Sequence, residues 1–218
     1  MNERKVIFMS MNGALWMTNH TGKMEGINSI GTSCVDNPFC INRRENGDSI
    51  CSHCYAATYM KMRKALKEHL AENAEILTTR LLKGREIPVT NSHIFRFESF
   101  GDLYNATHLA NYVLIAERNP FTQFGLWTKN TWGLDELFNK NGIAKPKNLS
   151  IVVSSPMMNK VIELDREKYW FVDHIFTVYD KKFIEVNNID INCGSRNCLG
   201  CQICYHKNEE FYVKEKLK

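Results

Sequence analysis

Apolar residues occur along this chain in short, almost continuous runs, and longer segments with helical periodicity lie between them. A strand of a parallel sheet is covered on both faces, so its sequence is apolar at nearly every position. The runs therefore predict strands of a mostly parallel sheet. The predicted strands cover residues 5–9, 92–98, 122–128, 149–154, 174–179 and 189–191.

The longest predicted helix covers residues 55–83, where apolar side chains recur every three or four positions and form one stripe. Gly84 and Pro88 follow this segment and predict its end. The charged residues 207–218 predict a short terminal helix or a frayed tail. Shorter helices are predicted over residues 103–118, with Asp102 as a candidate N-cap, and over residues 132–139 and 157–169.

Strands and helices alternate along the chain, which predicts βα units and the α/β class. A closed barrel of eight such units needs roughly 250 residues, and this chain has 218. We therefore expect a partial or open (β/α) barrel, that is a partial TIM barrel, of about six mostly parallel strands. Residues 1–188 would form this domain and contain the first cysteine group, and residues 189–218 would form a cysteine-rich C-terminal extension with the second.

The composition is that of a globular protein, with 44% hydrophobic and 24% charged residues. A net charge of +4 gives no indication of a nucleic-acid surface, and no apolar run is long enough to cross a membrane. The apolar run near the N-terminus is interrupted by Asn12 and Gly13, and no small-residue cleavage site follows it. We therefore expect a cytoplasmic protein, in which clustered cysteines bind metal rather than form disulfides.

Eight cysteines fall into two groups of four, with none between the groups. Four thiolates are the ligands of a tetrahedral zinc ion or of a [4Fe–4S] cluster. The N-terminal amides of the helix predicted from residue 55 would stabilise a thiolate just before it. Zinc sites generally bring two Cys-x2-Cys pairs together, and the first group has only one, which favours iron–sulfur and leaves a structural zinc site open. This first cysteine group consists of Cys34, Cys40, Cys51 and Cys54.

The second cysteine group has a more specific spacing. Its last three members follow one another at steps of three, as in the C-x2-C-x2-C run that wraps a cubane cluster in bacterial ferredoxins. Gly194 and Gly200 would let the backbone approach such a cluster closely. Iron–sulfur is again favoured over zinc. The second cysteine group consists of Cys193, Cys198, Cys201 and Cys204.

Polar residues follow four of the predicted strands at their carboxyl ends, where α/β proteins bind ligands. Such residues also begin loops simply because they cap the next helix, and this alternative stays open. If they line one pocket, it would hold a small-molecule ligand. The candidate pocket residues are Arg96, Glu98, Ser99, Asp102, Thr128, Lys129 and Ser154.

Several short motifs carry a family resemblance. They are Thr21-Gly22-Lys23, the Cys51-Ser52-His53-Cys54 run with the two cysteines before it, Ser99-Phe100-Gly101-Asp102 after Arg96, Trp127-Thr128-Lys129 and the cysteine-rich C-terminus. In this order they resemble the phage-associated gene product 88 family. The resemblance implies a bacteriophage protein acting in the host cytoplasm, and it implies no particular reaction.

A more distant similarity is to radical SAM enzymes, which combine a partial (β/α) barrel with an N-terminal cluster and sometimes a C-terminal auxiliary cluster. Their Cys-x3-Cys-x2-Cys motif leaves one iron open for S-adenosylmethionine. Here the first four cysteines are separated by 5, 10 and 2 residues. If all four bind, no open iron remains, whereas one remains if Cys34 or Cys40 stays free.

From the sequence we therefore expect two [4Fe–4S] clusters and redox or radical-type chemistry on an unknown small-molecule substrate, or with a redox partner. No membrane partner is expected and nucleic acid is not indicated. The alternative is a non-enzymatic protein whose two structural four-cysteine zinc sites support binding to a host protein or nucleic acid.

Overall fold

The computed structural model describes residues 8–11, 15–194 and 197–217. No helix in these ranges is long and apolar enough to cross a membrane. The described ranges contain eight strands: β1 (Phe8–Met11), β2 (Leu15–Asn19), β3 (Asn28–Ile30), β4 (Ile94–Phe97), β5 (Gln123–Thr128), β6 (Leu149–Ser154), β7 (His174–Tyr179) and β8 (Tyr212–Lys216). The α-helices are α1 (Pro38–Glu45), α2 (Tyr55–Met62), α3 (Lys64–Thr79), α4 (Ala106–Arg118), α5 (Thr131–Asp135), α6 (Lys181–Asn187) and α7 (Cys198–Cys201).

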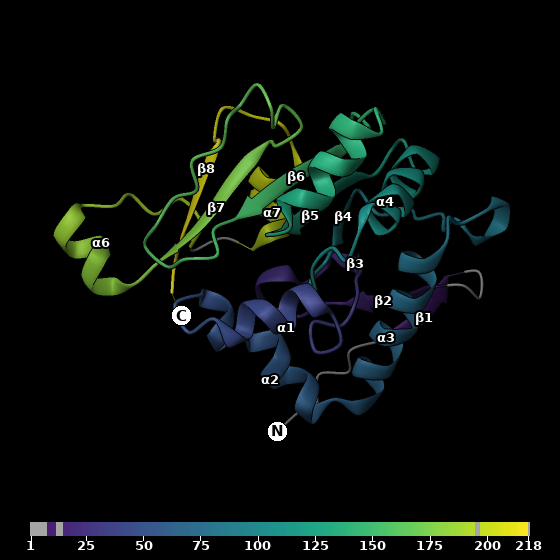
Figure 1. The fold of residues 1–218 in the computed structure, drawn as a ribbon, viewed down its shortest axis with the longest axis horizontal. Helices are drawn as coiled ribbons and strands as arrows, with labels where there is room; N and C mark the ends of the chain where they lie inside the picture. Colours follow the sequence, from purple (N-terminus) through teal and green to yellow (C-terminus); the bar gives the residue numbers. More distant parts are fainter. Residues whose placement is uncertain (1–7, 12–14, 195–196, 218) are drawn as a thin grey trace.

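The same ranges contain the short 3-10 helices η1 (Gly22–Met24), η2 (Ile50–His53), η3 (Gly84–Glu86) and η5 (Ile203–Tyr205), and a π-helical turn, η4 (Glu136–Lys140). The strands pair in the order β1-β2-β3-β4-β5-β6-β7-β8 and form one open sheet (Figure 1). Every pairing from β3 to β8 is parallel, whereas β2 is antiparallel to both of its neighbours. The predicted α/β fold with an open, mostly parallel sheet is confirmed.

The two faces of the sheet have different coverings. Parallel strands that pair in sequence order have crossovers of one hand, so their helices lie on the same face. On that face Phe97, Phe124 and Ile151 pack against buried side chains of α4, including Tyr112. The opposite face carries Trp127 and is covered by the segment around η5. Helices α1 and α2 lie together on the side where β7 leads into α6 (Figure 1).

Several predicted strands need correction. The strand predicted over residues 5–9 lies partly outside the described residues, and β1 begins at Phe8. Residues 189–191 form no strand, although Cys193 makes an isolated bridge with Glu215. The segment 207–218, predicted as a helix or a tail, contains β8. Charged side chains are tolerated there because β8 is an edge strand with only Val213 buried.

The helix predicted over residues 55–83 is broken into α2 and α3 at Arg63, which has an extended φ of −130°. Both helices contribute to one buried cluster, which includes Leu66 and Leu70 of α3. In α2, Ala56 and Met60 pack around Cys34. In α3, the buried Asn73 side chain bonds the backbone N–H and C=O of Trp16 in β2 at 2.7 and 2.9 Å. Helix α3 thus connects the cluster around Cys34 to β2.

The helix predicted over residues 157–169 does not form. Asn159 has a left-handed φ of +62°, and the Ser155 hydroxyl accepts from the N–H of Met157 and donates to the C=O of Lys160, which stabilises a turn. The N-cap predicted at Asp102 is also wrong. Helix α4 begins later, and its cap is Asn105, whose side chain accepts from the N–H of His108.

Candidate metal and ligand cavity

A cavity of about 990 Å³ lies where the carboxyl ends of the parallel strands meet α2, η1 and the C-terminal segment. Side chains of both cysteine groups line it, together with every residue predicted for the strand-end pocket. The fold thus brings together two motifs that lie more than a hundred residues apart in the chain. The cysteines on its wall are Cys34, Cys40, Cys51, Cys54, Cys193, Cys198, Cys201 and Cys204.

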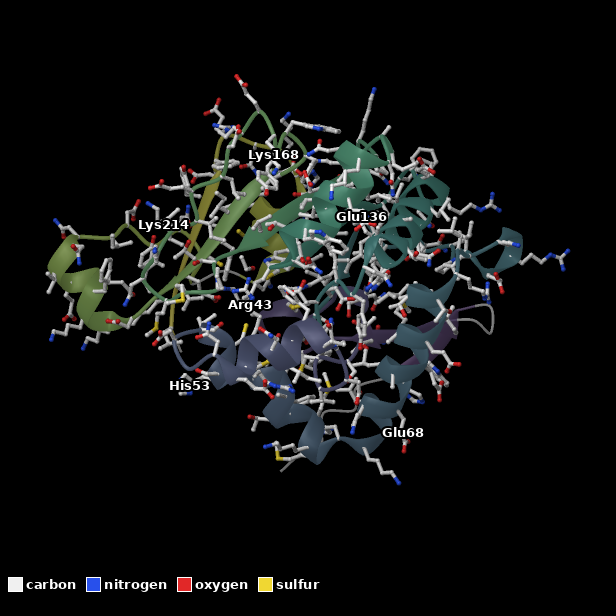
Figure 2. The ribbon with its side chains drawn as sticks, in the orientation of Figure 1. Arg43, His53, Glu68, Glu136, Lys168 and Lys214 are labelled. Carbon is white, nitrogen blue, oxygen red and sulfur yellow. The ribbon has the colours of Figure 1, made fainter. Side chains whose placement is uncertain are left out.

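The first cysteine group is built on the helical layer beside the sheet. Cys34 follows β3 and is almost fully buried, Cys40 lies on α1, Cys51 on η2 and Cys54 caps α2. Asn37 fixes the start of α1, because its side chain accepts from the N–H of Phe39 at 2.9 Å. Three of the four cysteines of this group are thus positioned by helices. His53, on the same layer, is labelled in Figure 2.

The Cys34 and Cys54 sulfurs form a coupled pair in which one thiol can donate to the other. This contact lowers the pKa of Cys54, and the backbone amides of Ala57 and Ala56 at the start of α2 lower it further. The same contact raises the pKa of Cys34, with burial adding to the rise. Cys54 is therefore the member of the pair that carries the negative charge.

Cys40 has a different environment within the same group. Burial raises the pKa of its thiol most, and the carboxylates of Asp102 and Glu98 raise it further. Cys51 and Cys54 also act on Cys40. The four sulfurs of the group are therefore close enough to interact electrostatically, and Cys40 is disfavoured as a thiolate in the metal-free protein.

The second cysteine group lies on the segment around η5, which covers the face of the sheet opposite α4. Cys198 and Cys201 begin and end α7, Cys204 lies on η5, and Cys193 forms its bridge with β8. The α7 turn is capped by Asn197, whose side chain accepts from the N–H of Gly200 at 2.7 Å. Burial raises the pKa of Cys193 and Cys198, and that of Cys204 to about 12.

Two cations oppose that rise. Lys23, on η1, donates to the Cys193 sulfur at 3.1 Å and to the Glu215 carboxylate at 2.6 Å. Arg96, on β4, favours the thiolates of Cys198 and Cys204. Residues far apart in sequence therefore supply positive charge to the second cysteine group.

The predicted pocket residues divide by what their polar atoms contact. The buried Glu98 carboxylate accepts from the Thr32 hydroxyl at 3.2 Å and from the Tyr112 hydroxyl, and His108 Nε2 lies 3.2 Å from it. The Asp102 carboxylate accepts from the Thr128 hydroxyl and from the Lys129 N–H at 2.9 Å. These carboxylates are occupied within the protein, so they shape the cavity wall.

Other predicted pocket residues have polar atoms that make fewer bonds within the protein. The Ser99 hydroxyl shares a hydrogen bond with Ser29 at 2.9 Å, and Ser29 in turn contacts His20 Nε2 at 2.7 Å. Lys129 acts electrostatically on Cys54 and Asp102 but makes no ion pair within the described ranges. Arg96 also lacks a carboxylate partner there, and Ser154 lines the cavity at the end of β6.

With this geometry in view, comparison with known proteins gives one match. The model of the Gene product 88 family matches residues 8–202, which is most of the chain and includes every candidate cysteine except Cys204. The chain belongs to the Gene product 88 family. No curated protein and no solved structure matches it significantly. The comparisons give no support for a similarity to radical SAM enzymes.

The cavity of this Gene product 88 protein also contains residues that sequence reasoning did not assign to the site. His20, Lys23, Trp127 and Tyr205 all line it. Lys23 lies in one of the family motifs, and Tyr205 directly follows Cys204, so nearness to a motif was the available signal. Their long-range partners, such as Lys23 with Glu215, could not be predicted from local pattern.

The eight cysteines are free thiols. Within the described part of the chain, no three His, Cys, Asp or Glu side chains are drawn together as they are around a single ion. The sulfurs of each group nevertheless interact electrostatically and face the same cavity. A cubane separates its four cysteine ligands farther than one zinc ion does, so this looser gathering of four thiols is compatible with a cluster.

Proposed function

We propose that this Gene product 88 protein holds one [4Fe–4S] cluster at each cysteine group and performs redox or radical-type chemistry on a small ligand bound between them. The observation that carries this proposal is the shared cavity, which both cysteine groups and the polar strand ends line. Two zinc sites that only brace the fold would have no reason to face one cavity. Clusters that exchange electrons with a common ligand would.

The donor sets support the proposal. Each group offers four free thiols, and the second has the C-x2-C-x2-C spacing of cubane sites. A cluster bound there would supply one-electron transfer. Cys54 is already favoured as a thiolate, whereas the second group relies on Lys23 and Arg96 to offset negative charge. Hydrogen bonds and charges of this kind tune cluster potentials.

Anaerobic purification tests the proposal directly. We expect a brown protein with about eight iron and eight sulfide per chain, as two cubanes require. Substituting one cysteine of either group, as in Cys54→Ser or Cys201→Ser, should lower both contents by about half. Ser52→Ala, within the first group's own loop, should leave them unchanged. A colourless protein with two zinc ions per chain would establish the zinc alternative instead.

Radical chemistry with S-adenosylmethionine would need one open iron in the first group. Cys40 is the candidate to stay unbound, because the buried carboxylates of Asp102 and Glu98 act on it, whereas Cys34 contacts the Cys54 sulfur within the group. In that case Cys40→Ser keeps the iron content and Cys34→Ser reduces it. S-adenosylmethionine should then change the electron paramagnetic resonance spectrum of the reduced protein. Loss of iron in both variants, with no spectral change, would leave electron transfer without this cofactor.

A further inference from the structure

Arg96 is a cation in the cavity whose charge no described carboxylate neutralises. It projects from β4 on the face of the sheet that carries Trp127, and it lines the cavity together with both cysteine groups. None of the ion pairs in the described ranges includes it. Its charge acts on His20 on one side and on Cys198 and Cys204 on the other.

The contacts that Arg96 does make fix the plane of its guanidinium. The group stacks on the Trp127 ring, with Cζ 4.0 Å from the ring centroid. Nη1 donates to the Met24 sulfur at 3.4 Å, and the buried Nε has no hydrogen-bond partner. The edge formed by Nε and Nη2 is thus held in place, and its Nε donor is unpaired. Two parallel N–H donors on one edge match the two oxygens of a carboxylate.

A second unpartnered polar group lies beside this edge. Tyr205 is only 1% exposed, and its buried hydroxyl has no hydrogen-bond partner of good geometry within the described residues. The hydroxyl lies beside the Arg96 guanidinium, which can only donate, so the phenol's own proton is available to a ligand. A buried hydroxyl without a partner is costly unless a ligand or water completes it.

The position of Tyr205 is fixed by close packing. Its ring meets Trp127 edge-on at 5.4 Å and lies over Gly125 of β5. A Cβ at residue 125 would come within 2.9 Å of the Tyr205 ring and 2.7 Å of the Trp127 ring. Glycine at this position therefore allows both rings to lie directly against the sheet, where Arg96 reaches them.

We propose that the cavity binds a small carboxylic acid, whose carboxylate lies against the Nε–Nη2 edge of Arg96 and accepts from the Tyr205 hydroxyl. The inference rests on the proposed function, because the two clusters would lie beside the ligand. The groups that bind the ligand, however, are side chains of the protein. One guanidinium and one neutral phenol match a single negative charge. A phosphate dianion would be left undercompensated between two cysteine groups that are themselves negative when they bind metal.

The competing role for Arg96 is only to offset the charge of the second cysteine group. That role needs a positive charge but not two parallel N–H donors, so a lysine could also perform it. Carboxylate binding needs the planar pair of donors. Arg96→Lys therefore separates the two roles, because it keeps the charge and removes the bidentate edge.

The test is calorimetric titration of the anaerobically purified, metal-loaded protein with acetate, succinate, citrate, glutamate and inorganic phosphate at constant ionic strength. We expect at least one carboxylate to bind saturably. Arg96→Met should weaken this binding about tenfold or more, Arg96→Lys by several-fold, and Tyr205→Phe by about threefold. The matched control is Arg166→Met, because Arg166 also stacks on an aromatic ring, 4.3 Å from the Phe211 centroid, but lies outside the cavity.

Three results would overturn the inference: no binding of any of the carboxylates, binding of phosphate alone, or equal binding by the parent protein and Arg96→Met. If Arg96→Met fails to fold, Arg96→Lys and Tyr205→Phe carry the test. Iron, sulfide and visible absorption are measured on the same samples. A zinc-loaded or colourless protein that still binds succinate through Arg96 would refute the clusters and keep the carboxylate site, so the two failures are distinguishable.

Discussion

The two cysteine groups reach the same cavity from supports of different kinds. The first rests on a small core of its own, in which Met60, Leu66 and Leu70 pack behind Cys34. The second lies on a short segment across the open face of the sheet, where Tyr205 and Cys198 pack with Ile27 and Ile94. One group is thus part of a packed layer, and the other is attached by a few contacts.

The two groups also differ in what stabilises their thiolates. The first group favours a thiolate at Cys54 mainly through its own neighbours, a thiol and two backbone amides of α2, to which Lys129 adds. In the second, burial raises the pKa of the thiols, and the opposing charges come from Lys23 and Arg96 on distant segments. The comparison teaches that the first group is locally prepared for metal, whereas the second depends on completion of the whole fold.

The largest effect should come from removing support behind the first group. Leu70 is 1% exposed in the core beneath Cys34, so Leu70→Ala should lower the free energy of unfolding by about 2–5 kcal/mol. Leu81→Ala, at a half-exposed site, should change it by less than about 0.5 kcal/mol. Urea unfolding followed by tryptophan fluorescence measures both.

The same variant tests whether the groups are independent. Metal analysis of Leu70→Ala below its unfolding transition should show loss at the first group, with the second retained. Equal loss from both groups would contradict the distinction between a local and a global support.

The next effect should appear as a pH dependence on the side of the first group. His20 bonds Ser29, and burial followed by the nearby Arg96 charge lowers its pKa to about 4 from 6.5. Because the folded state disfavours the charged imidazole, this stability is complete above about pH 6.5 and is lost as pH falls toward 4. The loss should reach up to about 3 kcal/mol.

Stability curves measured in urea at several pH values give this dependence. His20→Gln should flatten the curve between pH 4 and 6.5, whereas substitution of the exposed His93 by Gln should leave its shape unchanged. A parent protein whose stability is constant over that range would show that the imidazole is not held neutral.

A smaller effect should come from disturbing the packing under the second group. Gly125→Ala places a methyl group against the rings of Trp127 and Tyr205 and should cost about 1–3 kcal/mol. It should also reduce metal at the second group, because Tyr205 adjoins Cys204. In Gly133→Ala the new methyl group meets nothing closer than 3.7 Å, and since Gly133 lies in α5 the change should be neutral or slightly stabilising. Calorimetric unfolding and metal analysis compare the two.

Much of this architecture could be predicted from local pattern. The apolar runs that form β5, β6 and β7 were predicted almost to the residue, because a short, uninterrupted apolar run is typical of a strand buried on both faces. The polar residues at the strand ends were expected to meet at one edge, and Arg96 and Asp102 at β4 and Ser154 at β6 do line one cavity. Whether any of them binds a ligand stays a prediction.

The rest depended on tertiary partners. Strand β8 is mostly polar, and only its pairing with β7 makes it a strand. The break at Arg63 carries no glycine or proline, so no local pattern marks it. Tyr205 has no sequence pattern that marks it, and its role depends on Gly125 and Arg96 lying opposite it. These features were fixed by contacts across the sheet and not by periodicity.

The smallest of the expected effects concerns the cation that completes the second group. Burial alone would lower the pKa of Lys23, but its hydrogen bonds with Glu215 and Cys193 raise it, so the side chain stays charged. Lys23→Met should cost about 1–2 kcal/mol, because Glu215 and Cys193 then lose their shared donor. Lys64→Met breaks an exposed pair with Glu68 and should cost less than about 0.5 kcal/mol.

The metal content of Lys23→Met decides what this lysine does. If the second group depends on charge from distant segments, Lys23→Met should lose metal there while Cys54 and its neighbours retain theirs. Raising the pH should partly restore the lost metal, because it deprotonates thiols that Lys23 no longer favours as thiolates. Unchanged metal content would mean that Lys23 only ties η1 to β8 through Glu215, and that the second group is as self-sufficient as the first.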